Sequence, residues 1–357
     1  MINVTKTYLP NLDKYKNYVE KIFESGWLTN NGQFVKLLQE RLEAYLGVEH
    51  VILVSNGTLA LQVAYKALEL TGDVITTPFS FVATTSTLIW ENLNPIFVDI
   101  DKETFNIDSN KIESSITERT SAIVPVHVFG NPCDVEKISE VATKNNLKVI
   151  YDASHAFNIK YKNDSILNYG DISTLSFHST KIFHTIEGGA IIVKNHKLYE
   201  KIKLMINFGI SGPDRVECLG INCKMNEFQA AMGLCILDDM DSILKSREEV
   251  SSYYRNNLSK KLKMQKHEDY VTQNYSYFPV VFESEKILVK IKEQLNNNDI
   301  FPRRYFYPSL DTLSYINNDK SLPISFDLAN RILCLPIYES MYHDELDKIV
   351  KIINSSL

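Results

Sequence analysis

One lysine stands between two histidines in the segment SFHSTKIFHTIEGG, residues 176–189. The histidines, His178 and His184, are six residues apart and have no carboxylate or thiolate at ligand spacing, so the segment does not predict a metal site. A lone lysine is most often a solvated surface residue, but Lys181 follows a strand-like run and has Phe, His and Ile neighbours. An amine in apolar surroundings loses proton affinity and becomes a nucleophile. We therefore predict covalent chemistry at Lys181, without a metal.

Two further stretches carry groups suited to chemistry. Asp152 lies in the run LKVIYDA and His155 follows within one turn, although a strand-end aspartate is as often a helix cap. The stretch SNGT (55–58) precedes a helical pattern, and its Gly57 and Thr58 offer free N–H groups that suit a phosphate. By itself such a stretch is more often only a turn and a cap.

Together, these groups match what a protein supplies to pyridoxal phosphate. That cofactor requires a phosphate site, an acid for its pyridine nitrogen and a lysine amine for its aldehyde. It also needs an aromatic face over its ring, which Phe81 is placed to supply after a strand-like run. On pattern alone, a core phenylalanine on an amphipathic helix explains Phe81 equally well. The combination predicts a pyridoxal phosphate site.

An α/β domain with a largely parallel sheet must position these groups. From residue 50 onward, short β-branched runs alternate with helix-period stretches, the pattern of such a domain. Ligands of open parallel sheets bind at the carboxyl ends of strands, which is where these groups fall. Strands are expected at 50–55, 73–78, 94–100, 121–129, 147–153, 172–178 and 189–194, with helices at 59–70, at 81–92 after Ser80 as cap, and at 135–146.

The pattern changes after about residue 226. A long helix is expected from Asn226, its capping residue, to about Lys260. A strand at 275–282, a helix at 285–298, the loop FPRRYFYPSL (301–310) and a terminal amphipathic helix follow. We therefore expect two domains, a large α/β domain over 1–235 and a small α+β domain over 236–357.

Composition excludes several classes of function. The 357 residues include 38 Lys and Arg against 44 Asp and Glu, a net charge of -6, which argues against a nucleic acid or a membrane surface as partner. An anionic ligand must then meet a local basic cluster. Five cysteines without a CxxC pair, and the lack of a signal pattern or a long apolar stretch, lead us to expect a cytoplasmic protein.

Nine short motifs give the chain a resemblance to a known family over nearly its full length. In order they are GWLTNNG (26–32), SNGTLAL (55–61), TPFSFVAT (77–84), FVDID (97–101), PVHVFGNPCD (125–134), YDASHAF (151–157), SFHSTK (176–181), EGGAI (187–191) and GINCKMNEFQAA (220–231). The chain resembles the DegT/DnrJ/EryC1/StrS sugar aminotransferases. This resemblance implies the fold-type I, aspartate-aminotransferase-like fold of pyridoxal phosphate enzymes, with a seven-stranded sheet.

The resemblance also implies roles for residues at the cofactor. Lys181 matches the Schiff-base lysine, Asp152 the partner of the pyridine nitrogen, and His155 a residue against the ring and its phenolic oxygen. The cofactor is implied to be pyridoxal 5'-phosphate, with a pyridoxamine 5'-phosphate form during turnover. The implied phosphate and ring contacts are Gly57, Thr58, Ser176 and Phe81.

Further matched positions concern partners. Asn222 matches an asparagine that reaches the cofactor phosphate of a neighbouring subunit, which implies a homodimer with shared active sites. Regions that hold the nucleotide-sugar are matched by Trp27, Leu28, Thr29 and Asn31, and by the 301–310 loop, in which Arg303 and Arg304 would supply charge and Tyr305, Phe306 and Tyr307 flat surfaces. A snorkelling surface strand is the plainer interpretation of that loop. We expect His178 and His184 to shape the substrate side.

Some positions depart from the commonest family pattern. Ser154 and Ser179 stand where alanine is usual, and Cys223 and Lys224 alter the segment before the expected helix at 226, next to the implied dimer contact. The lysine is retained, whereas related sugar dehydratases carry histidine there. The resemblance therefore implies transamination.

The implied reaction moves an amino group from L-glutamate to a nucleotide-linked keto-6-deoxysugar. The motifs WLTNNG and KIFHTIEGG look most like those of enzymes that aminate C4 of dTDP-4-keto-6-deoxyglucose to give dTDP-4-amino-4,6-dideoxyglucose, for O-antigen or other surface polysaccharides. Amination at C3 of a dTDP-3-keto-6-deoxyhexose, a UDP- or GDP-linked substrate, a pyridoxal-phosphate-dependent sugar dehydratase and a non-enzymatic sensor are the alternatives.

Overall fold

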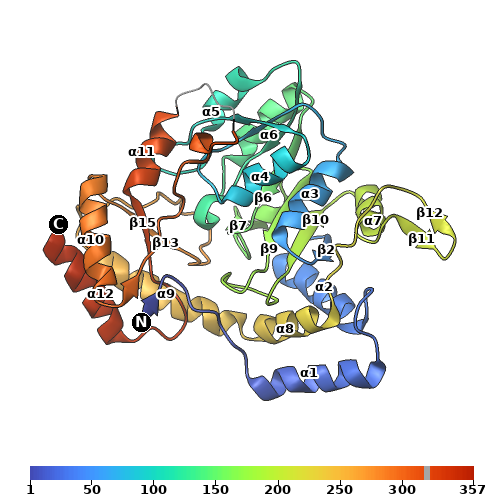
Figure 1. The fold of residues 1–357 in the computed structure, drawn as a ribbon, viewed down its shortest axis with the longest axis horizontal. Coiled ribbons are helices and arrows are strands. Elements are labelled where there is room, and N and C mark those ends of the chain that lie inside the picture. Colours follow the sequence, from blue (N-terminus) through green and yellow to red (C-terminus); the bar gives the residue numbers. More distant parts are fainter. Residues whose placement is uncertain (317–321) are drawn as a thin grey trace.

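A seven-stranded sheet forms the centre of the computed structural model, which describes residues 1–316 and 322–357 (Figure 1). Its strand order is β2-β10-β9-β6-β5-β3-β4, and β10 is antiparallel to both of its neighbours while the other pairs are parallel. The strands are β2 (His50–Val54), β3 (Asp73–Thr76), β4 (Asn94–Phe97), β5 (Thr120–Val124), β6 (Lys148–Asp152), β9 (Ile172–Ser176) and β10 (Gly189–Val193). Each predicted strand is confirmed, with shorter bounds.

Helices cover both faces of this sheet, because consecutive side chains of its strands are buried on opposite sides. Val51 and Leu53 of β2 pack in one apolar cluster with helices α2 and α8, whereas Ile52 and Val54 pack in another with α3 and α7. The helices around the sheet are α1 (Leu12–Ser25), α2 (Gln33–Leu46), α3 (Gly57–Ala67), α4 (Val82–Trp90), α5 (Ser109–Ile112), α6 (Val135–Lys144), α7 (His196–Met205) and α8 (Glu227–Asp238).

The C-terminal part of the chain has an apolar cluster of its own, at the left of Figure 1. Antiparallel β13 (Phe278–Val281) and β15 (Ile332–Leu335) pack there against α9 (Met240–Asn257), α10 (Glu285–Asn296) and α12 (His343–Ser356). The first strand of the chain, β1 (Ile2–Asn3), lies parallel to β14 (Ile300–Phe301) in this region. Helix α11 (Pro323–Arg331) leads into β15.

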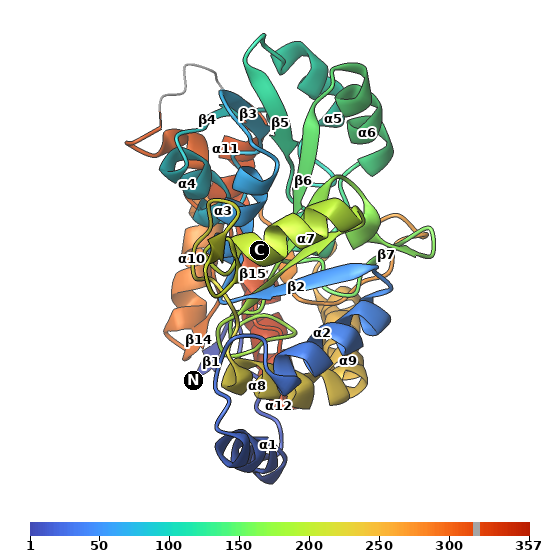
Figure 2. The same cartoon turned by 90° about the vertical axis from the view of Figure 1, so that its right-hand side faces the viewer.

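Two short hairpins complete the description. Hairpins form from β7 (Lys160–Tyr161) with β8 (Asp164–Ser165), and from β11 (Ile210–Gly212) with β12 (Arg215–Val216). The second hairpin projects beyond α7 in Figure 1, on the side of the molecule that faces the viewer in Figure 2. No helix among the described residues is both long and apolar enough to cross a bilayer.

Two expected helix boundaries are wrong. Helix α4 is preceded by Phe81 as its N-terminal cap, and the Ser80 hydroxyl instead lies 2.8 Å from that of Thr84. The long helix expected from Asn226 begins there with a full capping box, but it is divided at Asp239 into α8 and α9 and ends at Asn257. The backbone of Asp239 is not helical. The sequence does not reveal this break, because the helical spacing of apolar residues continues on both sides of it.

Candidate active site

A cavity of about 500 Å³ opens at the carboxyl ends of β6 and β9, beside the beginning of α3. Topology brings these ends together because the two strands are parallel neighbours. Of the residues singled out from the sequence for the cofactor or substrate, those that line the cavity are Gly57, Thr58, Phe81, Asp152, His155, Ser176, His178, Lys181, Arg303, Tyr305 and Phe306.

Lys181 lies in the turn that follows β9, where its backbone N–H donates to the carbonyl of His178 over 2.8 Å. Its Nζ donates to the hydroxyl of Tyr277 over 3.2 Å. Burial lowers the pKa of this amine to about 8, against the opposing fields of Asp152 and Tyr305. About a tenth of the amine is therefore neutral at pH 7, far more than for a solvated lysine, and this fraction can act as a nucleophile or base.

Asp152 ends β6 and is buried, yet both of its carboxylate oxygens have partners. Thr84 of α4 donates its hydroxyl to Oδ2 over 2.7 Å, and the backbone N–H of Ser154 donates to Oδ1 over 3.1 Å. A carboxylate whose two oxygens each accept a hydrogen bond is held in a fixed orientation. The carboxylate is thus oriented at the cavity wall.

His155 is a buried, flat neighbour of the cavity. Its ring is nearly parallel to that of Phe306, with centroids 5.6 Å apart, and to that of Phe129, at 6.2 Å. Burial, assisted by Lys181 and His127, lowers its pKa well below the usual value, so the imidazole is neutral. Because Nδ1 accepts the backbone N–H of Phe129 over 3.3 Å, the hydrogen resides on Nε2.

The first turn of α3 lines the cavity and has N–H groups that could bind an anion. The side chain of Asn56 caps the helix by accepting the N–H of Leu59, while the N–H groups of Gly57 and Thr58 donate to no group of the described residues. A Cβ on Gly57 would lie 2.8 Å from the Cβ of Ser176, so only glycine lets α3 approach β9 this closely. Phe81 stands at the rim, with half of its surface exposed.

Basic and aromatic groups form another part of the cavity wall. The guanidinium of Arg303 lies 4.8 Å from the ring centre of Tyr305, and within the described ranges no carboxylate is within 4 Å of it. His178 lies 3.5 Å from a carboxylate oxygen of Glu187 and binds the hydroxyl of Thr180 through Nδ1, over 2.8 Å. This wall can attract an anion and offer it a flat surface.

Comparison with known proteins assigns a family to this arrangement. The sequence profile described as "DegT/DnrJ/EryC1/StrS aminotransferase family" matches residues 12–354. The chain belongs to this family of aminotransferases. Its members are pyridoxal-phosphate-dependent enzymes, as the resemblance implied.

Relatives cover the whole chain. Proteins named dTDP-4-amino-4,6-dideoxy-D-glucose transaminase from Shigella dysenteriae and Escherichia coli are 42% and 40% identical to it, over 99% of this chain and 98% of each relative. The crystal structure of DesI with its TDP-sugar product superposes with a TM-score of 0.94 at 30% identity, covering 99% of this chain and 92% of DesI. The expected aminotransferase fold is thereby confirmed.

Several residues expected at the site lie elsewhere in this family member. Trp27, Leu28, Thr29 and Asn31 are exposed and do not line the cavity. Asn222 is exposed too, and its expected contact with a neighbouring subunit stays a prediction. Arg304 was expected beside Arg303, but it pairs with Glu285 over 2.8 Å and lies over Tyr307. His184 is also outside the cavity, because its ring nitrogens bind the backbone of Tyr8 and Ile186. Its expected role on the substrate side is therefore wrong. No group of three His, Cys, Asp or Glu in the described part of the chain could hold a metal.

The sequence did not point to two residues that bind the Asp152 carboxylate and the Lys181 amine. Thr84 donates to Asp152, and Tyr277, which directly precedes β13, contacts Lys181. Thr84 lies within the motif TPFSFVAT, so its position was visible but its direction was not. Tyr277 is 96 residues from Lys181, and no spacing rule connects them.

Proposed function

We propose that this enzyme transfers the amino group of L-glutamate to C4 of dTDP-4-keto-6-deoxyglucose, giving 2-oxoglutarate and dTDP-4-amino-4,6-dideoxyglucose. The observation that carries the proposal is an amine of lowered pKa, Lys181, in one cavity with Asp152 and an anion site. The names of the two relatives at 40% identity or more support the choice of sugar and nucleotide.

Residues of the cavity fit pyridoxal 5'-phosphate. The N–H groups of Gly57 and Thr58 with the hydroxyl of Ser176 would hold its phosphate, and Asp152 would pair with its ring nitrogen. His155 and Phe81 would flank the ring. The bound cofactor supplies an aldehyde and an electron-withdrawing ring that make the bonds at an amino acid's α-carbon labile.

Lys181 would move the proton in both halves of the reaction. Its neutral amine would act as the base that removes the α-proton of glutamate. The ammonium so formed would then act as the acid that returns a proton before 2-oxoglutarate is released. Asp152, fixed by Thr84 and Ser154, would keep negative charge opposite the ring nitrogen throughout. The neutral His155 adds no competing positive charge there.

The nucleotide-sugar would bind at the wall formed by Arg303, Tyr305 and His178. The whole protein is acidic, so a local cation is needed to attract a diphosphate. Arg303 has no carboxylate partner in the described residues and lies over an aromatic ring, so its donors are available.

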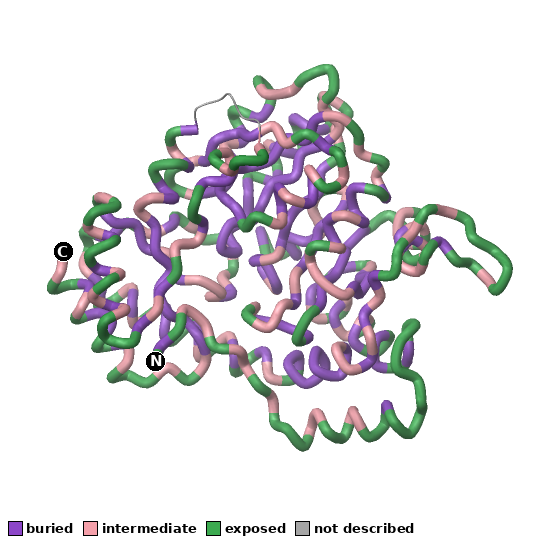
Figure 3. The backbone as a smooth tube through the Cα atoms, in the orientation of Figure 1, coloured by how far each residue is buried: buried purple, intermediate pink, exposed green. Residues whose placement is uncertain are grey.

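We further propose a homodimer with shared active sites. Asn222 and the segment 27–31 lie on the surface, as residues that complete a neighbour's site would. The nearby β11–β12 hairpin also exposes apolar side chains, among them Val216 and Leu219, at 69% and 77% of their surface. Figure 3 shows this projection as exposed or intermediate along most of its length.

Product analysis tests the proposed reaction. The purified protein is incubated with pyridoxal phosphate, L-glutamate and a panel of dTDP-, UDP- and GDP-linked keto-sugars, and the new amine is located by NMR. We expect one 2-oxoglutarate per amino sugar formed, with nitrogen on C4 of the dTDP-sugar. Nitrogen on C3 would contradict the proposed regiochemistry. Keto-sugar consumed without 2-oxoglutarate would indicate the dehydratase instead. Lys181→Ala is the inactive control.

A further inference from the structure

Tyr277 is the described side chain whose polar group lies closest to the amine of Lys181. Its hydroxyl accepts a hydrogen bond from Nζ over 3.2 Å, and no other group in the described residues bonds to that hydroxyl. Tyr277 directly precedes β13, in the C-terminal part of the chain, whereas Lys181 follows a strand of the central sheet. Two separate parts of the fold thus meet at the reactive nitrogen.

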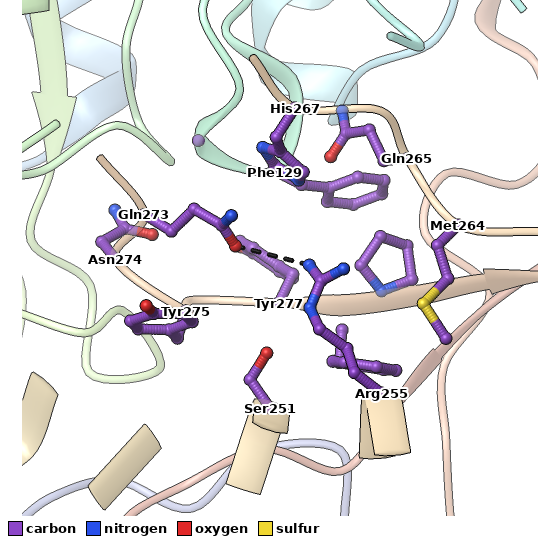
Figure 4. Close-up of a pocket in the computed structure, with 13 residues that line it drawn as sticks. Phe129, Ser251, Arg255, Met264, Gln265, His267, Gln273, Asn274, Tyr275 and Tyr277 are labelled. Carbon is purple, nitrogen blue, oxygen red and sulfur yellow. Dashed lines mark hydrogen bonds between the residues drawn. The ribbon is translucent and has the colours of Figure 1, made fainter. Parts of the chain in front are cut away.

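Aromatic neighbours fix the ring of Tyr277. It meets the edge of His155 at 4.8 Å between centroids and is perpendicular to Tyr305 at 5.7 Å. Tyr277 and Phe129 also line a second cavity, of about 30 Å³, together with Arg255 and Gln273 (Figure 4). The ring therefore forms a partition, and its hydroxyl reaches the active-site cavity.

The backbone before Tyr277 is held from both sides. Buried Asn274 donates to the carbonyls of His155 and Phe157, at 2.9 Å each, and accepts the N–H of Ser276 at 3.1 Å. From the C-terminal part, Arg247 forms a buried pair with Glu339 and makes long contacts of 3.4 Å to the carbonyls of Tyr275 and Ser276. Such anchoring gives the hydroxyl little freedom.

We propose that Tyr277 is a positioning residue that orients the Lys181 amine for proton transfer. The inference rests on the proposed transamination, in which Lys181 must leave the cofactor and then act as a base. Because the phenol oxygen accepts one N–H of the amine, the lone pair and the other hydrogen of the neutral nitrogen point into the cavity. A neutral phenol does this without the strong stabilisation of the ammonium that a carboxylate would give. Burial raises the pKa of Tyr277, so it remains neutral.

Tyr277→Phe isolates the hydroxyl, since the ring and its packing remain. The first measurement uses cofactor-free protein, in which acetylation of Lys181 by acetic anhydride is followed against pH by mass spectrometry. Because the phenol accepts from the ammonium, its removal should lower the midpoint by at least about 0.5 pH unit. Tyr275→Phe is the matched control, because that hydroxyl binds Glu248 instead, over 2.9 Å, and its midpoint should not change.

The second measurement follows the cofactor spectrum during the half-reaction with glutamate. We expect a rate about 10- to 100-fold lower in Tyr277→Phe and a larger isotope effect with α-deuterated glutamate, because proton transfer becomes limiting. An unchanged midpoint, or an unchanged isotope effect, would overturn the inference. If the wild-type protein does not react with glutamate, the proposed function fails, and the midpoint measured without cofactor still decides whether Tyr277 acts on Lys181.

Discussion

Through its proposed bond to the cofactor, Lys181 should make the uptake of pyridoxal phosphate depend on pH. Only the neutral amine attacks an aldehyde, and burial brings the pKa of this lysine from 10.5 to about 8. In cofactor-free protein, the rate of covalent pyridoxal phosphate uptake should therefore rise about tenfold per pH unit below pH 8 and level off above it. Stopped-flow absorbance measures this rate, and Lys181→Ala should show no covalent uptake. A midpoint near pH 10 would contradict a buried, activated amine.

Thr84 supports Asp152 from behind and offers a test with a close control. Thr84→Val removes a buried hydroxyl that donates to the carboxylate over 2.7 Å, so we expect the free energy of unfolding to fall by about 2 kcal/mol. The next residue, Thr85, is equally buried, but its hydroxyl has no partner in the described residues. Thr85→Val should therefore be neutral or stabilising. Urea unfolding of cofactor-free protein compares the two, and equal losses would show that the Asp152 contact contributes nothing.

At the scale of elements, the sequence predicts the central sheet because each strand is a short apolar run between helical periods. The same rule places Asp152, Ser176 and Lys181 at neighbouring strand ends, since those strands are parallel or consecutive. It cannot predict contacts between distant elements. Tyr277 could be predicted only as part of a strand. Whether Arg303 or Arg304 faces the cavity could not be predicted, because the direction of adjacent side chains in a loop depends on its three-dimensional path. The division of the chain near residue 235 stays a prediction.

Glu227 illustrates such a distant contact, between α8 and α2. Gly32 precedes α2 and offers no side-chain cap, and buried Glu227 supplies one by accepting the N–H groups of Phe34 and Val35 at 2.8 and 3.0 Å. A Cβ on Gly32 would lie 2.6 Å from the Glu227 side chain, which explains the glycine that ends GWLTNNG. The motif beside the expected sugar site is thus anchored by α8.

Exchanging this carboxylate for an amide should weaken the junction. In Glu227→Gln one acceptor oxygen is replaced by an NH₂ group, which cannot accept from the backbone N–H groups of α2. The favourable negative charge at the N-terminus of α2 is also lost. We therefore expect the free energy of unfolding to fall by about 2 kcal/mol. Glu40→Gln, an exposed position on α2, should change the free energy of unfolding by less than about 0.5 kcal/mol. Thermal and urea unfolding provide both values. Equal effects in the two variants would show that the contact between α8 and α2 is not stabilising.

At the scale of the whole molecule, several exposed apolar side chains gather on the hairpin that projects from the body (Figure 1). The β11–β12 hairpin and its flanks expose Phe208, Ile210, Val216 and Leu219, while α4 exposes Trp90. Scattered apolar residues are ordinary on a protein surface, but a projecting hairpin that exposes several of them is expected to be covered by a partner. A second copy is the partner that the expected role of Asn222 requires, and a twofold dimer is the commonest assembly that provides it.

Charged residues on the hairpin should therefore separate the subunits and weaken the cofactor site together. In the double variant Val216→Lys and Leu219→Lys, we expect sedimentation velocity to show monomers at a concentration where the unchanged protein is a dimer. Pyridoxal phosphate should dissociate more readily from the variant, because Asn222 could no longer reach a neighbouring phosphate. Val289→Lys, an exposed apolar position on α10, is the control and should remain dimeric and retain the cofactor. A double variant that stays dimeric would exclude the hairpin from the interface, and a monomer with undiminished cofactor affinity would show that each active site is complete within one chain.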